Sequence, residues 1–368
     1  MTPFLRKLLG MNWLLFASML ALAVFGVVAV YSATYFKTDD YWQKQAIWVG
    51  IGVAVFLAAS LIDYRWVKWT ALPLYLLSIV FLVLTYSALG EEHGGAKAWL
   101  NLKVITFQPS QLCVMAGILV IALFLSQFRK LHPFLKLCII GAIVGGPMIL
   151  ILKQPDFGMT MVWVPVILAM LFLGGIPKRY LIALFIFGAG IALPLAVNFA
   201  LKDYQRKRIV AFFDPEIDPK GTSWAINQSL IAIGSGGFSG KGFKAPNTQV
   251  EQGFLPGTTV HTDYIFSAIG EQWGFVGGVV LLGVFSVLLL CCLFTAYNAA
   301  DDFGLLITIG LAAQIFYHVY QNVGMTIALM PITGLPLPLV SYGGTFIVMM
   351  MFGLGLVNSV WIHRKPIG

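Results

Sequence analysis

Long apolar runs, separated by short polar turns, follow one another along almost the whole chain. Each run is close to the ~20 residues that an α-helix needs to cross the hydrocarbon core of a bilayer. Ten such runs cover residues 12–32, 44–62, 67–88, 108–128, 134–152, 157–174, 178–201, 264–296, 303–330 and 339–362. The pattern predicts an all-α integral membrane protein with about ten transmembrane helices.

One connection between the runs is much longer than the others. Residues 202–263 lie between the seventh and eighth runs and contain most of the polar residues of that half of the chain. We expect a single polytopic membrane domain over residues 1–368, with residues 202–263 as a large outer loop within it. The first run is too long for a signal-peptide core and ends without a small-residue cleavage pattern, so it is expected to be a retained span.

The composition supports a membrane protein and excludes several other classes. Of 368 residues, 59% are hydrophobic and 10% are charged, and the mean hydropathy is +0.87. A soluble domain has about 25% charged residues, so a soluble globule and a disordered chain are both excluded. The net charge of +8 does not come from a long basic stretch, so we expect no nucleic-acid partner. The four cysteines lie in apolar runs without ligand or disulfide spacing.

The basic residues predict the orientation in the membrane. An even number of spans places both termini on one side, and that side carries eleven Lys and Arg residues: Arg6, Lys7, Arg65, Lys68, Arg129, Lys130, Lys136, Lys178, Arg179, Arg364 and Lys365. The short loops opposite carry five: Lys37, Lys44, Lys97, Lys103 and Lys153. The positive-inside rule therefore predicts cytoplasmic termini, with the apolar helices in contact with membrane lipid.

The acidic residues divide the other way. Only Asp63, Asp301 and Asp302 fall on the side of the termini, whereas the other twelve of the 15 acids lie on or near the outer face. Chemistry that uses carboxylates is therefore expected to face outward. No Walker sequence supports a reaction driven by cytoplasmic ATP.

A glycine-rich stretch, Ile231 to Phe243, does not fit a nucleotide loop. Ser235, Ser239 and Gly242 stand where the Walker or dinucleotide registers need other residues. We expect a turn-rich loop near the membrane surface instead.

Asp263 lies where the long outer segment enters the eighth apolar run. It could cap the helix, alone or with Thr262, or it could be a catalytic group, and residue content leaves both interpretations open. His261 and Glu271 lie nearby in sequence, and Glu271 is about two helical turns further on, inside the apolar run.

Two further polar groups lie at outer ends of spans. Arg206, Lys207 and Arg208 follow the seventh run and suit either lipid headgroups or a lipid pyrophosphate. Lys153 and Asp156 lie at the turn between the fifth and sixth runs, where they could pair with each other or contact substrate.

Proline and glycine interrupt the chain near two other spans. Residues 108–111 (Gln-Pro-Ser-Gln) open the fourth run, where proline in a first helical turn is ordinary. Residues 330–345 contain three prolines and three glycines between two apolar runs. Broken backbone at membrane depth is tolerated where protein buries it or a wet cavity receives it, so the segment is either a cavity edge or a tight re-entrant turn.

These segments, taken in order, resemble the SEDS family (shape, elongation, division and sporulation), which are ten-span peptidoglycan glycosyltransferases. The resemblance runs through almost the whole chain. It is carried by GGAKAWLNL with ITFQPSQ, KQPDFG, FFDPEIDPKGTSWAINQSLIAIGSGGFSGKGF, FLPGTTVHTDYIFSAIGEQWGF and MPITGLPLPLVSYGGT.

The resemblance implies polymerisation of lipid II on the outer face of the bacterial cytoplasmic membrane, with displacement of undecaprenyl pyrophosphate from the growing glycan. Asp263 matches the aspartate of the family's HTD motif and becomes the proposed general base. The resemblance also implies a substrate-binding set: Arg206, Arg208, Lys153, Asp156, Trp99, Gln111, His261, Thr262 and Ser341. It further implies a class B penicillin-binding protein as transpeptidase partner.

The chain departs from the family pattern at several charged positions. Gln111, Gly257 and Gln272 stand where relatives usually have glutamate, and Ala98 stands where they have arginine. Which acid besides Asp263 assists catalysis is therefore left open. Asp263, Asp156 and Glu251 are outer acids able to coordinate a divalent ion such as Mg²⁺ or Mn²⁺ with the pyrophosphate, although no spacing enforces a site and no other cofactor is expected.

Two short features of the sequence bear on the branch of the family. The short tail before the first run is similar to the RodA-type branch of cell elongation and cell shape, which we favour. The AIGEQ run after Ile265 and Phe266 is more similar to the FtsW-type division branch, which is the alternative. A lipid II flippase is the alternative from another class, since ten spans and a broken Pro/Gly segment permit it. A non-catalytic scaffold that recruits the transpeptidase is a third.

Overall fold

A computed structural model describes residues 3–36, 40–93, 96–101, 103, 106–195, 198, 201, 203–214, 216, 218 and 221–364. Lys37, Lys202, Lys365 and the side chain of Lys207 lie outside the described part. The helices of the amino-terminal half are α1 (Pro3–Leu9), α2 (Trp13–Thr34), α3 (Tyr41–Leu61), α4 (Val67–Leu84), α5 (Pro109–Gln127), α6 (Pro133–Lys153) and α7 (Phe157–Leu173). They are followed by α8 (Lys178–Phe187), α9 (Leu193–Leu195), α10 (Asp203–Phe213), α11 (Thr222–Gly236), α12 (Ile265–Tyr297), α13 (Asp302–Thr326) and α14 (Gly344–Ile362).

The helices match the predicted spans closely. Among the described residues, eight helices are long and apolar enough to cross a membrane: α2, α3, α4 with its preceding turn, α5, α6, α12, α13 and α14. Helix α7 is a shorter apolar helix. The predicted seventh span, 178–201, begins with α8 and continues through a π-helical turn, Gly188–Ala192, into α9, and part of its end lies outside the described residues. The all-α, multi-pass membrane class is confirmed.

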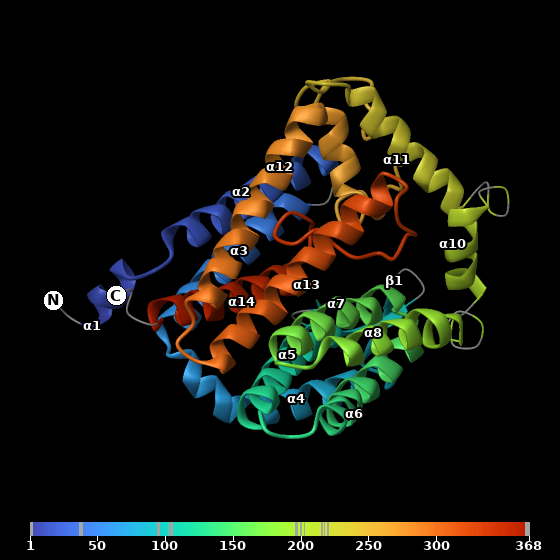
Figure 1. Cartoon of the computed structure of the whole chain (residues 1–368). Helices are drawn as coiled ribbons and strands as arrows, with labels where there is room; N and C mark the ends of the chain where they lie inside the picture. The colour runs from blue at the N-terminus through green and yellow to red at the C-terminus, as the bar shows by residue number, and fades with distance from the viewer. Residues whose placement is uncertain are drawn as a thin grey trace.

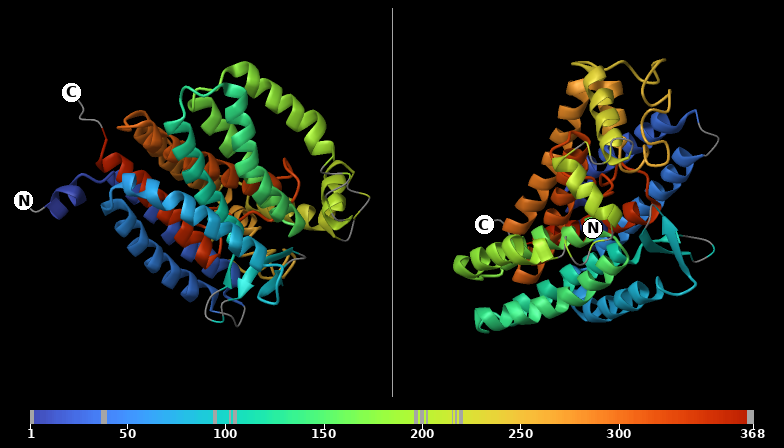
Figure 2. Two further views of the ribbon diagram at one scale, coloured as in Figure 1. Left: turned by 90° about the horizontal axis from the view of Figure 1, so that it is seen from below. Right: turned by 90° about the vertical axis from the view of Figure 1, so that its right-hand side faces the viewer.

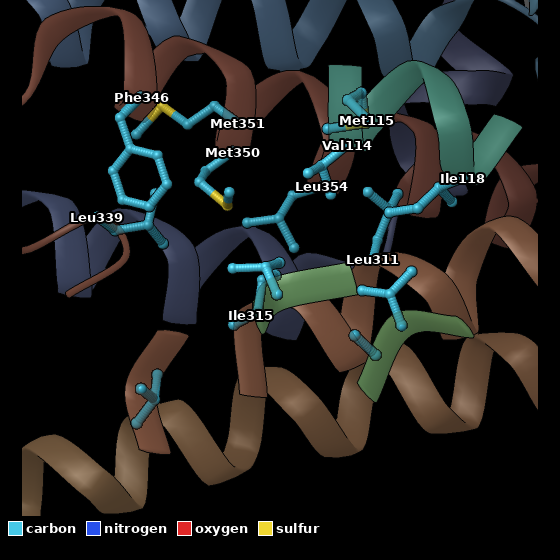
Figure 3. Packing of buried hydrophobic residues seen from close by; sticks show 14 of the residues in the cluster. Val114, Met115, Ile118, Leu311, Ile315, Leu339, Phe346, Met350, Met351 and Leu354 are labelled. Carbon is cyan, nitrogen blue, oxygen red and sulfur yellow. The ribbon is translucent and has the colours of Figure 1, made fainter. Parts of the chain in front are cut away.

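Helices α5, α13 and α14 form the centre of the bundle. Figure 3 shows Met115 and Ile118 of α5 close to Leu311 of α13 and Leu354 of α14, with Phe346 at one edge of the cluster. Most of α5 is buried, whereas α4 and α6 are buried on about one face only. Apolar side chains that face outward are expected where lipid rather than water surrounds a helix.

The two ends of the chain lie at the same end of the bundle (Figures 1 and 2). The backbone N–H of Asn12, before α2, donates to Oδ1 of Asn358 in α14 at 2.9 Å. Helix α10 and the only sheet of the described residues lie toward the opposite end (Figure 1). Helix α10 and the sheet are therefore separated from the termini by the length of the apolar helices.

The sheet is a feature that the apolar runs did not predict. Strands β1 (Gly90–His93), β2 (Ala96–Asn101) and β3 (Thr106–Phe107) pair antiparallel in that order, with Glu91 opposite Trp99 and Leu100 opposite Phe107. In β2, Ala98 and Leu100 are buried and their neighbours are partly exposed, so the strand has one buried face.

The long segment of residues 202–263 is partly helical, and the prediction of a turn-rich loop over residues 231–243 is wrong for its first part. Residues 231–236 of the glycine-rich stretch belong to the end of α11, and turns begin only at Gly237. Helix α11 runs beside the first turns of α12, where the backbone of Gly236 approaches that of Gly270 too closely for a Cβ atom (Figure 1). Small residues permit such close helix approach.

Residues 237–242, the glycine-rich turn after α11, form backbone hydrogen bonds with both sides of a break in α12. Gly274 has φ 63° and ψ −161°, which interrupts the helix. The N–H groups of Phe275 and Val276 donate to the carbonyls of Gly237 and Phe238 at 2.9 and 3.1 Å. In return, the N–H groups of residues 241 and 242 donate to the carbonyls of residues 271 and 272, both at 3.0 Å. Backbone groups released by the break thus find partners, as a membrane environment requires.

Candidate functional site

A cavity of about 830 Å³ opens between the helix ends that lie opposite the termini (Figure 1). Its wall combines segments that are far apart in sequence: α3, β2, the turn before α7, α10, the turn before α12, and the segment between α13 and α14. The polar and aromatic lining residues include Lys44, Trp48, Trp99, Asn101, Lys103, Gln108, Gln111, Asp156, Gln205, Arg208, Thr258, Thr259, His261, Thr262, Asp263, Thr333 and Tyr342.

The segment between α13 and α14 forms one edge of this cavity. Residues 331–334, 336 and 342–346 line it. The carbonyls of this broken backbone are satisfied by buried side chains of α13: Gln321 Nε2 donates to Pro331 O at 2.9 Å, and Asn322 Nδ2 donates to Leu335 O at 2.8 Å. The cavity-edge interpretation of residues 330–345 therefore fits the structure.

The same region holds three consecutive carbonyls of the turn before α12. The carbonyl of His261 accepts from the N–H of Tyr342 at 2.8 Å, and the carbonyl of Thr262 accepts from Ser341 Oγ at 2.5 Å. The carbonyl of Asp263 accepts from Asn322 Nδ2 at 2.9 Å. The His-Thr-Asp and Ser-Tyr-Gly-Gly sequences are therefore two halves of one hydrogen-bonded unit.

The Asp263 side chain does not cap α12. The N-cap position is Tyr264, and no side chain accepts a hydrogen bond there. The carboxyl of Asp263 instead faces the cavity, and its Oδ2 lies 3.5 Å from the position that a Cβ atom on Gly334 would occupy. Burial raises the pKa of Asp263 to about 6, while Arg208 and a hydrogen bond from Thr262 act in the opposite direction.

A second carboxylate, Asp156, shares the cavity. Its Oδ1 accepts from the N–H of Met159 at 3.0 Å and caps α7, and its Oδ2 accepts from Gln108 Nε2 at 2.9 Å. Burial raises the pKa of Asp156 to about 6, and its charge also raises the pKa of Asp263. Gln111 donates to Gln108 Oε1 at 2.9 Å, so it reaches Asp156 through one intermediate amide.

Lys153 is placed differently from its sequence neighbour Asp156. It is exposed at the end of α6 and is not part of the cavity lining. The Lys153–Asp156 ion pair, one of the two predicted alternatives, is not found among the described residues. The carboxylate of Asp156 instead accepts hydrogen bonds from the N–H of Met159 and from Gln108 Nε2.

Helix α10 presents one of its two arginines to the cavity. Gln205 and Arg208, three residues apart and so on one helix face, both line it. Gln205 Nε2 donates to Pro155 O at 2.8 Å, which fixes this face against the turn that carries Asp156. Arg206 is exposed and does not line the cavity.

The remaining predicted residues have different roles in the structure. Trp99 lines the cavity from β2. His261 lines the cavity and packs against the rings of Tyr41 and Tyr342, with centroids at 4.3 and 5.4 Å, and these two rings also contact each other at 5.1 Å. Ser341 is fully buried and is absent from the lining, and it holds Thr262 rather than facing the cavity.

Sequence reasoning missed Lys44 and Trp48, which line the cavity from α3. Lys44 opens the second apolar run and has the pattern of an ordinary interfacial base, so no sequence signal distinguishes it. Asn322 lies inside an apolar run, where a buried amide is itself a signal for function.

Glu271 has a different task from Asp263. It is fully buried, forms an ion pair with Lys241 at 2.7 Å, and accepts from the N–H groups of Gln249 and Val250 at 2.7 and 3.2 Å. It thus anchors the outer segment and does not line the cavity.

The described residues contain no group of three or more His, Cys, Asp or Glu side chains that could hold a metal ion. Glu251, one of the three acids considered, is outside the cavity lining and accepts from the N–H of Asn247 at 2.7 Å. Asp156 and Asp263 are left as the pair of carboxylates in the cavity. This pair fits the way Mg²⁺ commonly binds, through one or two carboxylates and substrate phosphates.

Comparison with known proteins shows the family. The family model described as "Cell cycle protein", which covers FtsW, RodA and SpoVE, matches residues 12–366, and the chain belongs to this family. The SEDS identification made from the motifs is therefore confirmed.

Individual relatives match nearly the whole chain. The chain is 35% identical to peptidoglycan glycosyltransferase MrdB of Escherichia coli K12 (94% of this chain, 92% of the relative) and 31% identical to peptidoglycan glycosyltransferase RodA of Treponema pallidum (97% and 98%). Among solved structures, it resembles a chain of a peptidoglycan synthase complex (TM-score 0.81, 30% identity, 97% and 99% coverage). It also resembles the rod shape determining protein RodA of Thermus thermophilus (TM-score 0.70, 28% identity, 97% and 98% coverage). The predicted similarity to the RodA type is thereby supported.

Proposed function

We propose that the protein is a peptidoglycan glycosyltransferase that polymerises lipid II during cell elongation. The observation that carries this proposal is the cavity in which Asp263 and Arg208 lie together. A base and a cation in one cavity are the two groups that sugar transfer from a pyrophosphate requires. The names of the relatives, peptidoglycan glycosyltransferases, support the same reaction.

The reaction assigns a separate task to each group. The 4-hydroxyl of the incoming lipid II sugar attacks the anomeric carbon of the growing chain, forming a C–O bond as the bond to the pyrophosphate breaks. Asp263 accepts the hydroxyl proton, and a carboxylate with a pKa of about 6 is a stronger base than an ordinary one while remaining largely ionised at neutral pH. Arg208 stabilises the charge of the departing undecaprenyl pyrophosphate.

The location and the partner are parts of the same proposal. The excess of basic residues on the side of the termini supports cytoplasmic termini in a bacterial inner membrane, with the cavity facing outward. Similarity to a chain of a peptidoglycan synthase complex supports a class B penicillin-binding protein as partner.

Polymerisation and flipping are separated by one experiment. The full-length protein, purified with its transpeptidase partner, is expected to convert lipid II into long glycan strands resolved by gel electrophoresis. Vesicles containing the same protein should not accelerate transfer of labelled lipid II between leaflets. Flipping without polymer in these assays would support the flippase alternative and contradict the proposal, whereas neither activity would support the scaffold.

Replacing Arg208 by alanine is expected to lower kcat/KM for lipid II polymerisation about tenfold or more, because the departing pyrophosphate loses its cation. The magnitude follows because a hydrogen bond to a charged group contributes about 1.5–3 kcal/mol, and 1.4 kcal/mol is a factor of ten. Initial polymerisation rates over a range of lipid II concentrations measure the effect. Arg206→Ala is the matched control on the same helix: its side chain is exposed outside the cavity, so its kcat/KM should stay within about twofold. Equal changes in kcat/KM in the two variants would remove Arg208 from the site.

A further inference from the structure

We propose that Asn322 of α13 is a positioning residue that holds the catalytic turn in place for sugar transfer. It does not touch the cavity but acts through Asp263. The inference rests on the proposed function, in which Asp263 accepts the proton of the attacking hydroxyl.

A single amide group of Asn322 links the turn before α12 to the segment between α13 and α14. Its Nδ2 donates both to the carbonyl of Asp263, at 2.9 Å, and to the carbonyl of Leu335, at 2.8 Å. Leu335 follows Gly334, and Asp263 Oδ2 lies 3.5 Å from the position that a Cβ atom on Gly334 would occupy. The amide therefore fixes the backbone of Asp263 relative to the cavity edge that its side chain faces.

The chemistry of this contact requires a primary amide. Asn322 is fully buried, so water is not available to replace a lost donor. The two hydrogens of Nδ2 match the two carbonyl oxygens, and Oδ1 has no hydrogen-bond partner among the described residues. The reverse orientation of the amide would place its oxygen against both carbonyls. A carboxylate at this position would repel both of them, and an aliphatic side chain would leave both buried carbonyls without their donor.

The backbone groups around Asp263 form hydrogen bonds within the turn, to the segment before α14, and to α13. The N–H of Asp263 donates to Thr259 O at 2.9 Å, which is a contact within the turn. The carbonyls of His261 and Thr262 are held by residues 342 and 341. Among the described residues, Asn322 provides the hydrogen bond that reaches the carbonyl of Asp263 itself from a spanning helix. Because catalysis depends on a carboxylate placed to within a fraction of an ångström, this bond should affect the rate of the chemical step.

The neighbouring residue, Gln321, provides a matched control. It is also buried on α13, and its Nε2 donates to Pro331 O at 2.9 Å, so it supports the same broken segment. This amide hydrogen bond goes to the broken segment and not to the turn that carries Asp263. Loss of its amide removes a hydrogen bond of the same type from the same segment while leaving the link to Asp263 intact.

The test compares Asn322→Leu with Gln321→Met, each of which replaces a side-chain amide by an apolar group of similar length. Full-length protein with its transpeptidase partner is assayed for kcat and KM with lipid II. Asn322→Leu is expected to lower kcat about 10²-fold with KM within about threefold, because substrate binding is unchanged and the base is displaced. Gln321→Met should keep both constants within about threefold.

Three outcomes would overturn the inference: parental kcat in Asn322→Leu, an equal loss in the two variants, or a rise in KM that accounts for the loss. If Asn322→Leu does not purify as a folded protein, Asn322→Ala, which also removes both donors, is measured instead, and parental kcat in that variant overturns the inference as well. Asp263→Asn is assayed in parallel. Full activity of Asp263→Asn contradicts the proposed function, whereas its inactivity beside a fully active Asn322→Leu contradicts only the positioning role.

Discussion

Replacing Asp263 by alanine is expected to lower kcat for glycan polymerisation by about 10³-fold, within the range that general-base catalysis contributes. The carboxyl does not cap α12, so its removal should cost little stability. Polymer formed from lipid II by the full-length protein and its partner, measured in single-turnover and steady-state assays, gives the rate.

The control for this variant is an acid of the same outer segment that lies outside the cavity. Asp214 is exposed after α10, and it is absent from the cavity lining. Asp214→Ala should therefore polymerise lipid II within about twofold of the parental rate. A folded Asp263→Ala protein that polymerises at the parental rate would remove Asp263 from the mechanism.

Replacing Gly240 by alanine is expected to destabilise the protein by about 3 kcal/mol, the sum of a left-handed backbone and an overpacked contact. Gly240 has φ 82°, and a Cβ atom there would lie 2.2 Å from the carbonyl oxygen of Gln272. The methyl group would push the glycine-rich turn away from the break in α12, which that turn repairs. Thermal unfolding in detergent measures the loss.

Gly283 is the matched control for this prediction. It lies in the regular second part of α12, and no atom is within 4 Å of the position of its Cβ. Gly283→Ala should change stability by no more than about 1 kcal/mol, the difference in helix propensity between the two residues. Similar melting temperatures for Gly240→Ala and Gly283→Ala would show that the close approach at Gly240 is not required.

Much of the fold could be predicted from the apolar pattern alone. The spanning helices start and end within a few residues of the predicted runs: the sixth run, 157–174, becomes α7, Phe157–Leu173. The last span is the exception, since α14 begins at Gly344 rather than at 339. The residues before it are not helical, Gly334 and Leu339 have positive φ, and buried amides of α13 donate to the carbonyls of Pro331 and Leu335.

Features that depend on distant contacts could not be predicted in this way. The short strands of the sheet are stabilised by pairing with one another, and β3 is only two residues long. The helical end of α11 was interpreted as turns because glycine is a poor helix former, but its packing against α12 at Gly270 outweighs that preference.

In the candidate site, too, local motifs predict some residues, and contacts between distant residues could not be predicted. Asp263, Arg208 and Asp156 were predicted as site residues, and the structure brings them to one cavity. Ser341 and Arg206 were predicted with them but do not line it. The hydrogen bond between Asn322 and Asp263 joins residues 59 positions apart, so only the folded chain reveals it. Local motifs therefore identify the reactive groups, and the fold identifies what holds them.

The pH dependence of kcat/KM for lipid II polymerisation tests the central claim, that Asp263 acts as the base, most directly. Burial raises the pKa of Asp263 to about 6, and a protonated carboxyl cannot accept the proton of the attacking hydroxyl. The rate should therefore be highest above this value and fall about tenfold per pH unit below it. Asp156, with a similar pKa in the same cavity, titrates together with Asp263, so the apparent value belongs to the pair. A rate that stays constant from pH 7 to pH 5, or rises as the pH falls, would contradict the account.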